Sequence, residues 1–207
     1  MRYRHFLIPL LAALTVSLCY GEVYPFDPAQ STVEVLVPKA GLLSFVGHEH
    51  SIRTDSVSGR LNLNADQPAQ NRVSFSIPVT SLTVLDPSLG ADDRATVTEH
   101  MHAIDVLNAE SFGTISFTSS SVKASTDTRI SVRGTLIVAG QKAEIKFDAD
   151  IYELPNGGVS VKGETTLELA DFGIKPVSAL AGAVKTGKSV QIKFLVATLA
   201  PQQSRTP

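Results

Sequence analysis

An alternation of apolar and polar residues with a period of two recurs along most of the chain. Between Ala143 and Ile151 every second residue is apolar, and the residues between them are all charged. Successive side chains of a β-strand point to opposite faces, so such a run has one face for the core and one for water. Strands of antiparallel sheets show this pattern, whereas parallel strands are usually apolar on both faces. The sequence therefore predicts an antiparallel all-β protein.

Eight runs of this kind follow one another along the chain. They cover Val33–Val37, Leu61–Leu63, Val73–Val79, Ile115–Phe117, Ile130–Val138, Ala143–Ile151, Val159–Leu169 and Val190–Val196. The short connections at Ala139-Gly140 and at residues 155–158 suit hairpins between neighbouring runs. Eight antiparallel strands can close into a barrel, which removes the exposed edges of the sheet. We therefore expect an eight-stranded antiparallel barrel.

Three segments lack the alternation. Ala91–Leu107 is predicted to form one helix before the fourth strand, because Asp92 and Asp93 near its start interact favourably with a helix dipole. Residues 39–56 and 170–187 are predicted to be long irregular connections. Loops of that length in a compact domain usually carry function, so both are candidates for a binding site.

The N-terminal residues have the organisation of a secretory signal peptide. Arg2 and Arg4 precede the apolar stretch Phe6–Val16, which is shorter than the about 20 residues that a membrane-spanning helix needs. We expect cleavage after Gly21, so that residues 1–21 are a signal peptide and the mature protein is periplasmic or secreted.

The single cysteine falls inside this N-terminal segment. Acylation of Cys19 is a second interpretation, which Leu18 disfavours because a lipoprotein signal has a small residue at that position. Removal of residues 1–21 leaves a chain without cysteine, which suits an oxidising compartment. We expect one barrel domain over residues 22–200 and a disordered tail over residues 201–207.

Charge and composition exclude several functions. The 18 Lys and Arg residues are outnumbered by 20 Asp and Glu residues, whereas nucleic-acid binders usually carry a basic excess. One cysteine cannot form a multi-cysteine zinc site. Asp171-Phe172-Gly173 resembles the metal-binding triplet of protein kinases, but no glycine-rich phosphate loop accompanies it. No nucleophile motif is present either, so we expect a non-enzyme with no nucleic-acid partner and assign no catalytic residue.

Composition leaves open what fills the barrel. The inward side chains are mainly Val, Ile and Ala with few aromatics, and mid-sized aliphatic groups fill a wide barrel poorly. An eight-stranded barrel either packs its interior with side chains or holds one small ligand.

Four segments, taken in order, resemble a known family. They are Phe26–Val33 near the start, Ala103–Ser119 after the predicted helix, Arg133–Gly140 at a hairpin, and Asp171–Ile174. Together they resemble the YceI-like lipid/polyisoprenoid-binding family over about residues 24 to 198, in a variant branch with a Gly-His-x-His loop at residues 47–50. The resemblance implies a lipocalin-like barrel whose interior binds a long isoprenoid chain, polyprenyl or quinone-like.

We expect the inward apolar side chains to line this lipid site and polar groups of the two long connections to contact the head group. The expected lipid-binding residues are Phe45, Val73, Phe75, Ile77, Phe117, Leu136, Ile145, Phe147, Leu167, Ile192 and Phe194. No cofactor besides the lipid is expected, and any membrane contact would be transient. The sequence leaves open whether the protein forms a homodimer.

Two pairs of histidines have no place in a plain lipid carrier. His48 and His50 would point the same way in an extended segment, whereas His100 and His102 would diverge by about 200° on a helix. They could lie at the rim, bond a lipid head group, or supply three ligands to Zn²⁺ or Cu²⁺. The alternative functions are therefore a metal-binding or redox-associated periplasmic protein, or a structural barrel without a ligand.

Overall fold

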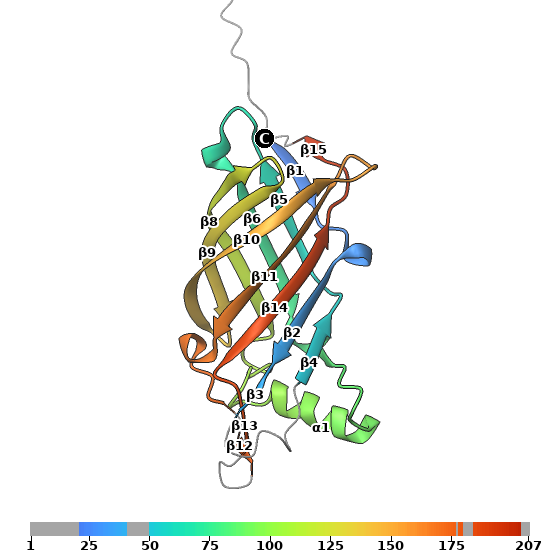
Figure 1. Ribbon diagram of the computed structural model, residues 1–207, viewed down its shortest axis with the longest axis vertical. Helices are drawn as coiled ribbons and strands as arrows, with labels where there is room; N and C mark the ends of the chain where they lie inside the picture. Colours follow the sequence, from blue (N-terminus) through green and yellow to red (C-terminus); the bar gives the residue numbers. More distant parts are fainter. Residues whose placement is uncertain (1–20, 41–49, 177, 180–183, 204–207) are drawn as a thin grey trace, which may run out of the picture.

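One long antiparallel sheet, curled around an apolar interior, forms most of the protein (Figure 1). The computed structural model describes residues 21–40, 50–176, 178–179 and 184–203. The twelve strands of this sheet are β1 (Glu22–Pro25), β2 (Thr32–Val37), β4 (His50–Thr54), β5 (Ser58–Leu63), β6 (Arg72–Pro78), β7 (Thr83–Val84), β8 (Thr114–Thr126), β9 (Arg129–Val138), β10 (Gln141–Glu153), β11 (Val159–Glu168), β14 (Ser189–Ala197) and β15 (Gln202–Gln203). The prediction of an antiparallel all-β protein is confirmed.

The sheet has twelve strands rather than the predicted eight because four long segments are interrupted. The 3-10 turns η1 (Pro28–Gln30) and η3 (Val79–Ser81) separate β1 from β2 and β6 from β7, and short non-strand segments separate β4 from β5 and β14 from β15. Pro28 illustrates the cause, since proline has no N–H to donate to a neighbouring strand. Each of the eight predicted runs falls in one strand of the sheet, to within one residue at its end. The four strands without a predicted run are β1, β4, β7 and β15.

The first and last strands lie side by side, so the sheet curls back on itself. Phe194 of β14 is paired with Val33 of β2, and Gln202 of β15 is paired with Val23 of β1. Between these ladders a bridge joins Thr198 to Phe26. Gln202 and Gln203 belong to the segment predicted to be disordered, yet they extend this pairing.

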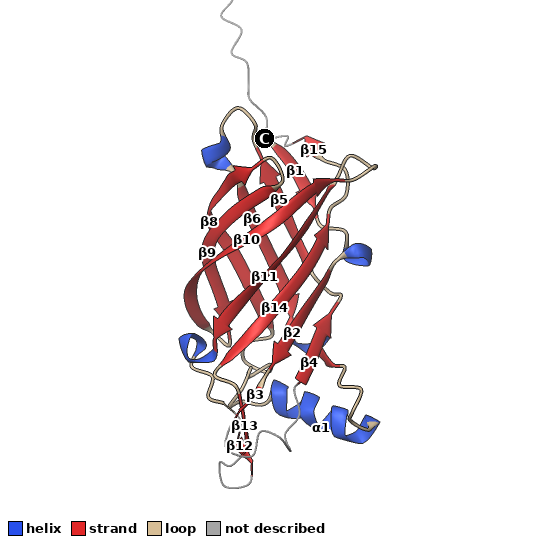
Figure 2. Cartoon of the chain, viewed as in Figure 1, coloured by secondary structure: helices blue, strands red, loops and turns tan. Residues whose placement is uncertain are grey.

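The two ends of the barrel differ, and we name them by what lies there (Figure 1). At the helix end lies α1 (Ala91–His102), beside a small second sheet of β3 (Lys39–Ala40), β12 (Ser178–Ala179) and β13 (Val184–Thr186). At the terminal end lie β1 and β15. Figure 2 shows the strands running between the two ends and the helical segments around them.

Helix α1 is shorter than the predicted helix over residues 91–107. It ends at His102 because Ala103 has an extended backbone, and the chain then turns sharply, with the Leu107 N–H donating to the Met101 carbonyl at 3.2 Å. Asp92 and Asp93 occupy its first turn. No helix among the described residues is long and apolar enough to span a bilayer.

The two connections predicted to be irregular are partly ordered. β4 lies within residues 39–56 and pairs with β2, so this part of the prediction is wrong. The connections also meet, because Thr186 of β13 is paired with Lys39 of β3. Their contact gives the helix end a small sheet of its own.

Phenylalanines and glycines alternate around the middle of the barrel. The ring centroids of Phe75, Phe117, Phe147 and Phe194 follow one another at 5.3, 5.8 and 5.4 Å. A Cβ atom on Gly134 would lie 2.7 Å from the Phe117 ring. A Cβ atom on Gly163 would lie 2.6 Å from the Phe194 ring. The absence of side chains at these two glycines therefore makes room for rings from neighbouring strands, an arrangement known to stabilise glycine-containing sheets.

The segment Asp171–Ile174 has a structural role. It closes η4 (Leu169–Phe172), where Gly173 adopts a left-handed conformation with φ 70° that favours glycine. Phe172 and Ile174 on either side are buried. The Asp-Phe-Gly triplet thus turns the chain at the end of β11.

Candidate functional site

A cavity of about 410 Å³ lies inside the barrel. Strand β9 lines it from Ile130 near the terminal end to Val138 at the helix end. At about 3.3 Å per residue, this stretch of strand is about 26 Å long. The cavity is therefore long and narrow, a shape that suits a chain molecule better than a compact one.

The cavity wall is almost wholly aliphatic and aromatic. Nine of the residues predicted to bind a lipid chain line it: Val73, Phe75, Ile77, Leu136, Ile145, Phe147, Leu167, Ile192 and Phe194. They come from the five strands β6, β9, β10, β11 and β14, and the period-two alternation turns each of them inward. Phe45 lies outside the described residues.

Phe117 has a different place from the one predicted. It does not line the cavity, and only 1% of its surface is exposed. Its ring packs between those of Phe75 and Phe147 and over Gly134. Phe117 thus packs against residues of the wall without reaching the cavity, because its neighbours cover it.

Part of the wall comes from segments that the alternation did not select. Helix α1 contributes Thr96, Val97, His100 and Met101, and the chain after η4 contributes Ile174 and Lys175. Val97 and Met101 are four residues apart, the spacing that places two apolar residues on one helix face. That spacing was the available signal for a helix covering one end of the cavity.

The polar wall residues include His50, His100 and Lys175, and all three belong to the helix end. His50 is the first residue of β4, His100 lies in the last turn of α1, and Lys175 follows η4. Among the described residues, no Asp or Glu lines the cavity. The site therefore combines an apolar length with a basic end.

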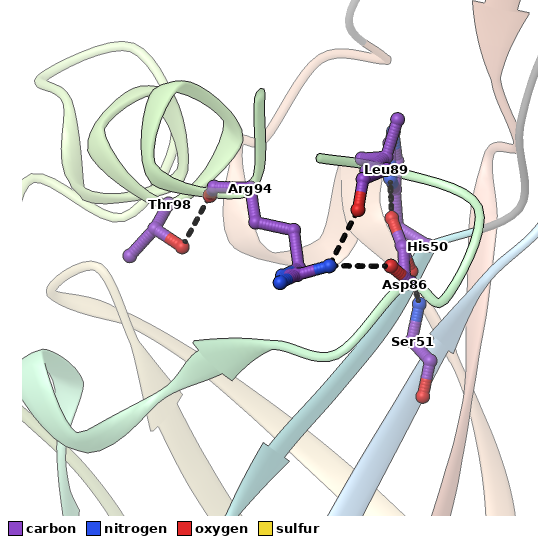
Figure 3. Close-up of polar contacts among 6 residues, drawn as sticks. All are labelled: His50, Ser51, Asp86, Leu89, Arg94 and Thr98. Atoms are coloured by element: carbon purple, nitrogen blue, oxygen red, sulfur yellow. Dashed lines mark hydrogen bonds and ion pairs between the residues drawn. The ribbon is translucent and has the colours of Figure 1, made fainter. Parts of the chain in front are cut away.

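His50 is fixed by a buried carboxylate (Figure 3). Its Nδ1 lies 2.5 Å from Oδ2 of Asp86, whose side chain is only 1% exposed. The N–H of Ser51 donates to the other oxygen, Oδ1, at 2.6 Å. Asp86 follows β7, so this contact ties the segment leading to α1 onto β4.

Arg94 of α1 holds the same segment (Figure 3). Its Nη1 donates to the carbonyl of Leu89 at 2.5 Å and to the backbone carbonyl of Asp86 at 3.3 Å. The polar contacts of Asp86 and Arg94 therefore run from β4 through residues 86–89 to the helix. They position the part of α1 that faces the cavity.

The other histidines do not gather around His50. His100 Nε2 lies 3.8 Å from Asp105 Oδ2, and His102 Nε2 is buried with no partner among the described residues. His48 lies outside the described residues. No group of three or more His, Cys, Asp or Glu side chains within those residues could hold a metal ion, so the structure does not support the metal-binding interpretation.

Comparison with known proteins identifies the architecture. A family model described as a YceI-like domain matches residues 24–198. No curated protein sequence matches the chain significantly. The solved structure of Burkholderia cenocepacia BcnA is similar with a TM-score of 0.66 and 16% identity, covering 83% of this chain and 98% of BcnA.

Two further solved structures share the fold. A polyisoprenoid-binding domain from Saccharophagus degradans, implicated in plant cell wall breakdown, has a TM-score of 0.61 and 15% identity over 86% of this chain and 98% of that domain. The Campylobacter jejuni YceI protein has a TM-score of 0.57 and 15% identity over 74% of this chain and 85% of that protein. At these identities the likeness establishes the lipocalin-like fold.

Proposed function

The chain belongs to the family of YceI-like domains, and from this premise we propose that it binds an isoprenoid-type lipid, polyprenyl or quinone-like, inside the barrel. The polyisoprenoid-binding domain of S. degradans supports this class of ligand, since it shares the fold. The apolar chain would lie along β9, and the head group would lie at the helix end.

The observation that carries the proposal is a large apolar cavity in a small protein. At about 24 cal/mol per Å³, leaving 410 Å³ vacant would cost on the order of 10 kcal/mol. That is comparable to the whole free energy of unfolding of a typical domain, about 5–15 kcal/mol. Water would offset little of this cost along the aliphatic length of the cavity, because an apolar wall gives it no hydrogen bonds. An apolar ligand would remove this cost.

A hydrocarbon chain gains affinity from burial alone. Each CH₂ group removed from water contributes about 0.8 kcal/mol, so a long chain needs few polar contacts. The wall matches this requirement, because its polar residues are few and its length is aliphatic. The expected activity is therefore holding a lipid without transforming it.

The compartment forms part of the proposal. The signal-like residues 1–21 and the lack of cysteine in the rest of the chain support a periplasmic or secreted protein. In that location a buried apolar cavity would carry lipid through water, with transient membrane contact during loading and release.

Native mass spectrometry of the protein, expressed with its own N-terminus and purified without detergent, tests the proposal. We expect a non-covalent adduct whose mass corresponds to a chain of isoprene units. An acyl lipid instead would contradict the isoprenoid part of the proposal. Absence of any adduct, together with failure to take up geranylgeraniol, would contradict lipid binding as a whole.

A further inference from the structure

The ionisable side chains on the cavity wall are all basic, although the chain as a whole is acidic. The formal net charge is -2. Yet the titratable side chains that line the cavity are His50, His100 and Lys175, with no carboxylate among the described residues. Binding of a hydrocarbon chain alone does not require basic residues. Their presence at one end of the cavity therefore concerns the head group of the ligand.

The contact between His50 and Asp86 gives this basic end a directed donor. A buried carboxylate is costly unless a cation or several donors compensate it. Asp86 accepts hydrogen bonds from the Ser51 N–H and from His50 Nδ1, and the bond from an imidazolium to a carboxylate is charge-assisted and stronger than a neutral one. A protonated His50 supplies that compensating cation.

An imidazolium has two N–H donors, and Asp86 accepts only one of them. No described residue accepts a hydrogen bond from Nε2, and His50 is part of the cavity wall. Within the part of the chain that the structure describes, the Nε2–H of a protonated His50 is thus an unused donor at the helix end of the cavity. Its natural partner is an oxygen that accepts without donating.

We propose that the helix end selects a ligand with an anionic head group, phosphate or carboxylate, and that Nε2–H of His50 donates to it. Lys175 adds positive charge at the same end, and His100 adds a second imidazole. Asp86 acts as a positioning residue, since it fixes the ring and its proton without lining the cavity. This inference rests on the proposed lipid function and specifies the class of head group.

Three ligands with one chain and different head groups test it: geranylgeranyl phosphate, geranylgeranic acid and geranylgeraniol. Each is titrated into delipidated full-length protein, and the dissociation constants are compared. We expect at least one anion to bind about tenfold or more tightly than the alcohol, the order expected for one charge-assisted hydrogen bond. The two anions separate a phosphate site from a carboxylate site.

Variants locate the preference. His50→Leu removes the donor, and Asp86→Asn removes the charge that holds the proton on His50 while keeping an acceptor for Ser51. In both, the ratio of anion to alcohol affinity should fall, by up to about tenfold, which simple loosening of the fold would not produce because it weakens both ligands alike. Lys123→Met removes an exposed lysine of β8 outside the cavity and should leave the ratio unchanged.

The outcomes are distinct. Equal binding of all three ligands by the wild type would overturn the inference and leave the proposed function standing, and so would an unchanged ratio in His50→Leu. Tighter binding of the alcohol would show a neutral His50 that accepts from a hydroxyl group. Failure of all three ligands to bind would contradict lipid binding itself. If Asp86→Asn does not fold, His50→Leu alone decides.

Discussion

The two ends of the barrel are held together by different kinds of contact. At the terminal end, β1 pairs with β5 on one side and with β15 on the other, so backbone ladders fix its shape. At the helix end, the ladders are short: β7 adds only two residues to β4, and β3, β12 and β13 form a separate small sheet. One backbone hydrogen bond, from the Leu85 N–H to the Ser51 carbonyl, and several side chains attach the segment before α1. Asp86 and Arg94 provide those attachments.

This difference has a consequence for exchange of a ligand. Opening the terminal end would break several backbone hydrogen bonds at once, whereas displacing α1 breaks a few side-chain contacts. Regions held by few contacts open at lower free energy than the paired core. We therefore expect the helix end to be the end that opens for a ligand, and it is also where the basic residues lie.

The largest expected effect comes from a charge in the apolar middle, between the two ends. Phe147→Asp places a carboxylate against the rings of Phe117 and Phe194. An uncompensated buried charge costs about 3–5 kcal/mol, so urea unfolding should show a loss of that size and co-purified lipid should disappear. The matched control is Tyr152→Asp on the same strand, whose side chain is exposed. A folded Phe147→Asp protein with wild-type lipid content would contradict the inward assignment.

A smaller loss is expected from the ring of phenylalanines and glycines. In Gly134→Ala the new Cβ would lie 2.6 Å from the Ser119 Cα and 2.7 Å from the Phe117 ring. Overpacking of this kind costs about 2–3 kcal/mol, measurable as a lower urea midpoint with an unchanged slope.

Gly113→Ala is the control for that substitution, because its nearest atom would be 3.5 Å away, an ordinary contact. It should stay within about 0.5 kcal/mol of the wild type, as surface substitutions usually do. Equal losses in the two variants would mean that the cost comes from the backbone of glycine and that the neighbouring rings have no part in it.

Local sequence pattern accounts for the middle of the barrel and for little of the helix end. The inward face of β10 could be predicted because alternation over residues 143–151 is a local property of a strand. The strand β4 could not, since its residues alternate poorly and it is defined by its pairing with β2. The contact of His50 with Asp86 joins residues 36 apart, and no spacing rule connects them. The chemistry of the site thus depends on tertiary contacts that its sequence motif, two histidines one residue apart, does not specify.

Removal of the Arg94 contacts should increase local opening at the helix end and leave the rest of the barrel unchanged. Arg94→Met keeps an aliphatic stem similar to that of arginine and loses the hydrogen bonds to the carbonyls of Leu89 and Asp86. We expect a loss of about 1–2 kcal/mol, confined to the helix. Hydrogen exchange of the α1 amides should therefore become about tenfold faster while that of β9 stays unchanged. Arg60→Met, at an exposed position of β5, should change neither, and faster exchange throughout the barrel would contradict a local role for Arg94.

The smallest effect at neutral pH is expected at the terminal end, where Tyr24 of β1 is buried and donates a hydrogen bond from its hydroxyl to Glu22 Oε2 at 2.6 Å. Burial, with help from the hydrogen bond to Glu22 and from the charges of Glu22 and Glu153, raises the pKa of Tyr24 to about 12. The folded state therefore holds this proton more tightly than the unfolded chain, whose tyrosines titrate near about 10. The contribution of Tyr24 to stability is complete below pH 10 and is lost as the pH rises towards 12.

Tyr24→Phe should cost about 1 kcal/mol at pH 7 and then lose less stability than the wild type above pH 10, measured by urea unfolding at each pH. Tyr152→Phe, at an exposed tyrosine of β10, should run parallel to the wild type, and a Tyr24→Phe curve that also stays parallel would remove the hydroxyl of Tyr24 from the forces that hold the terminal end.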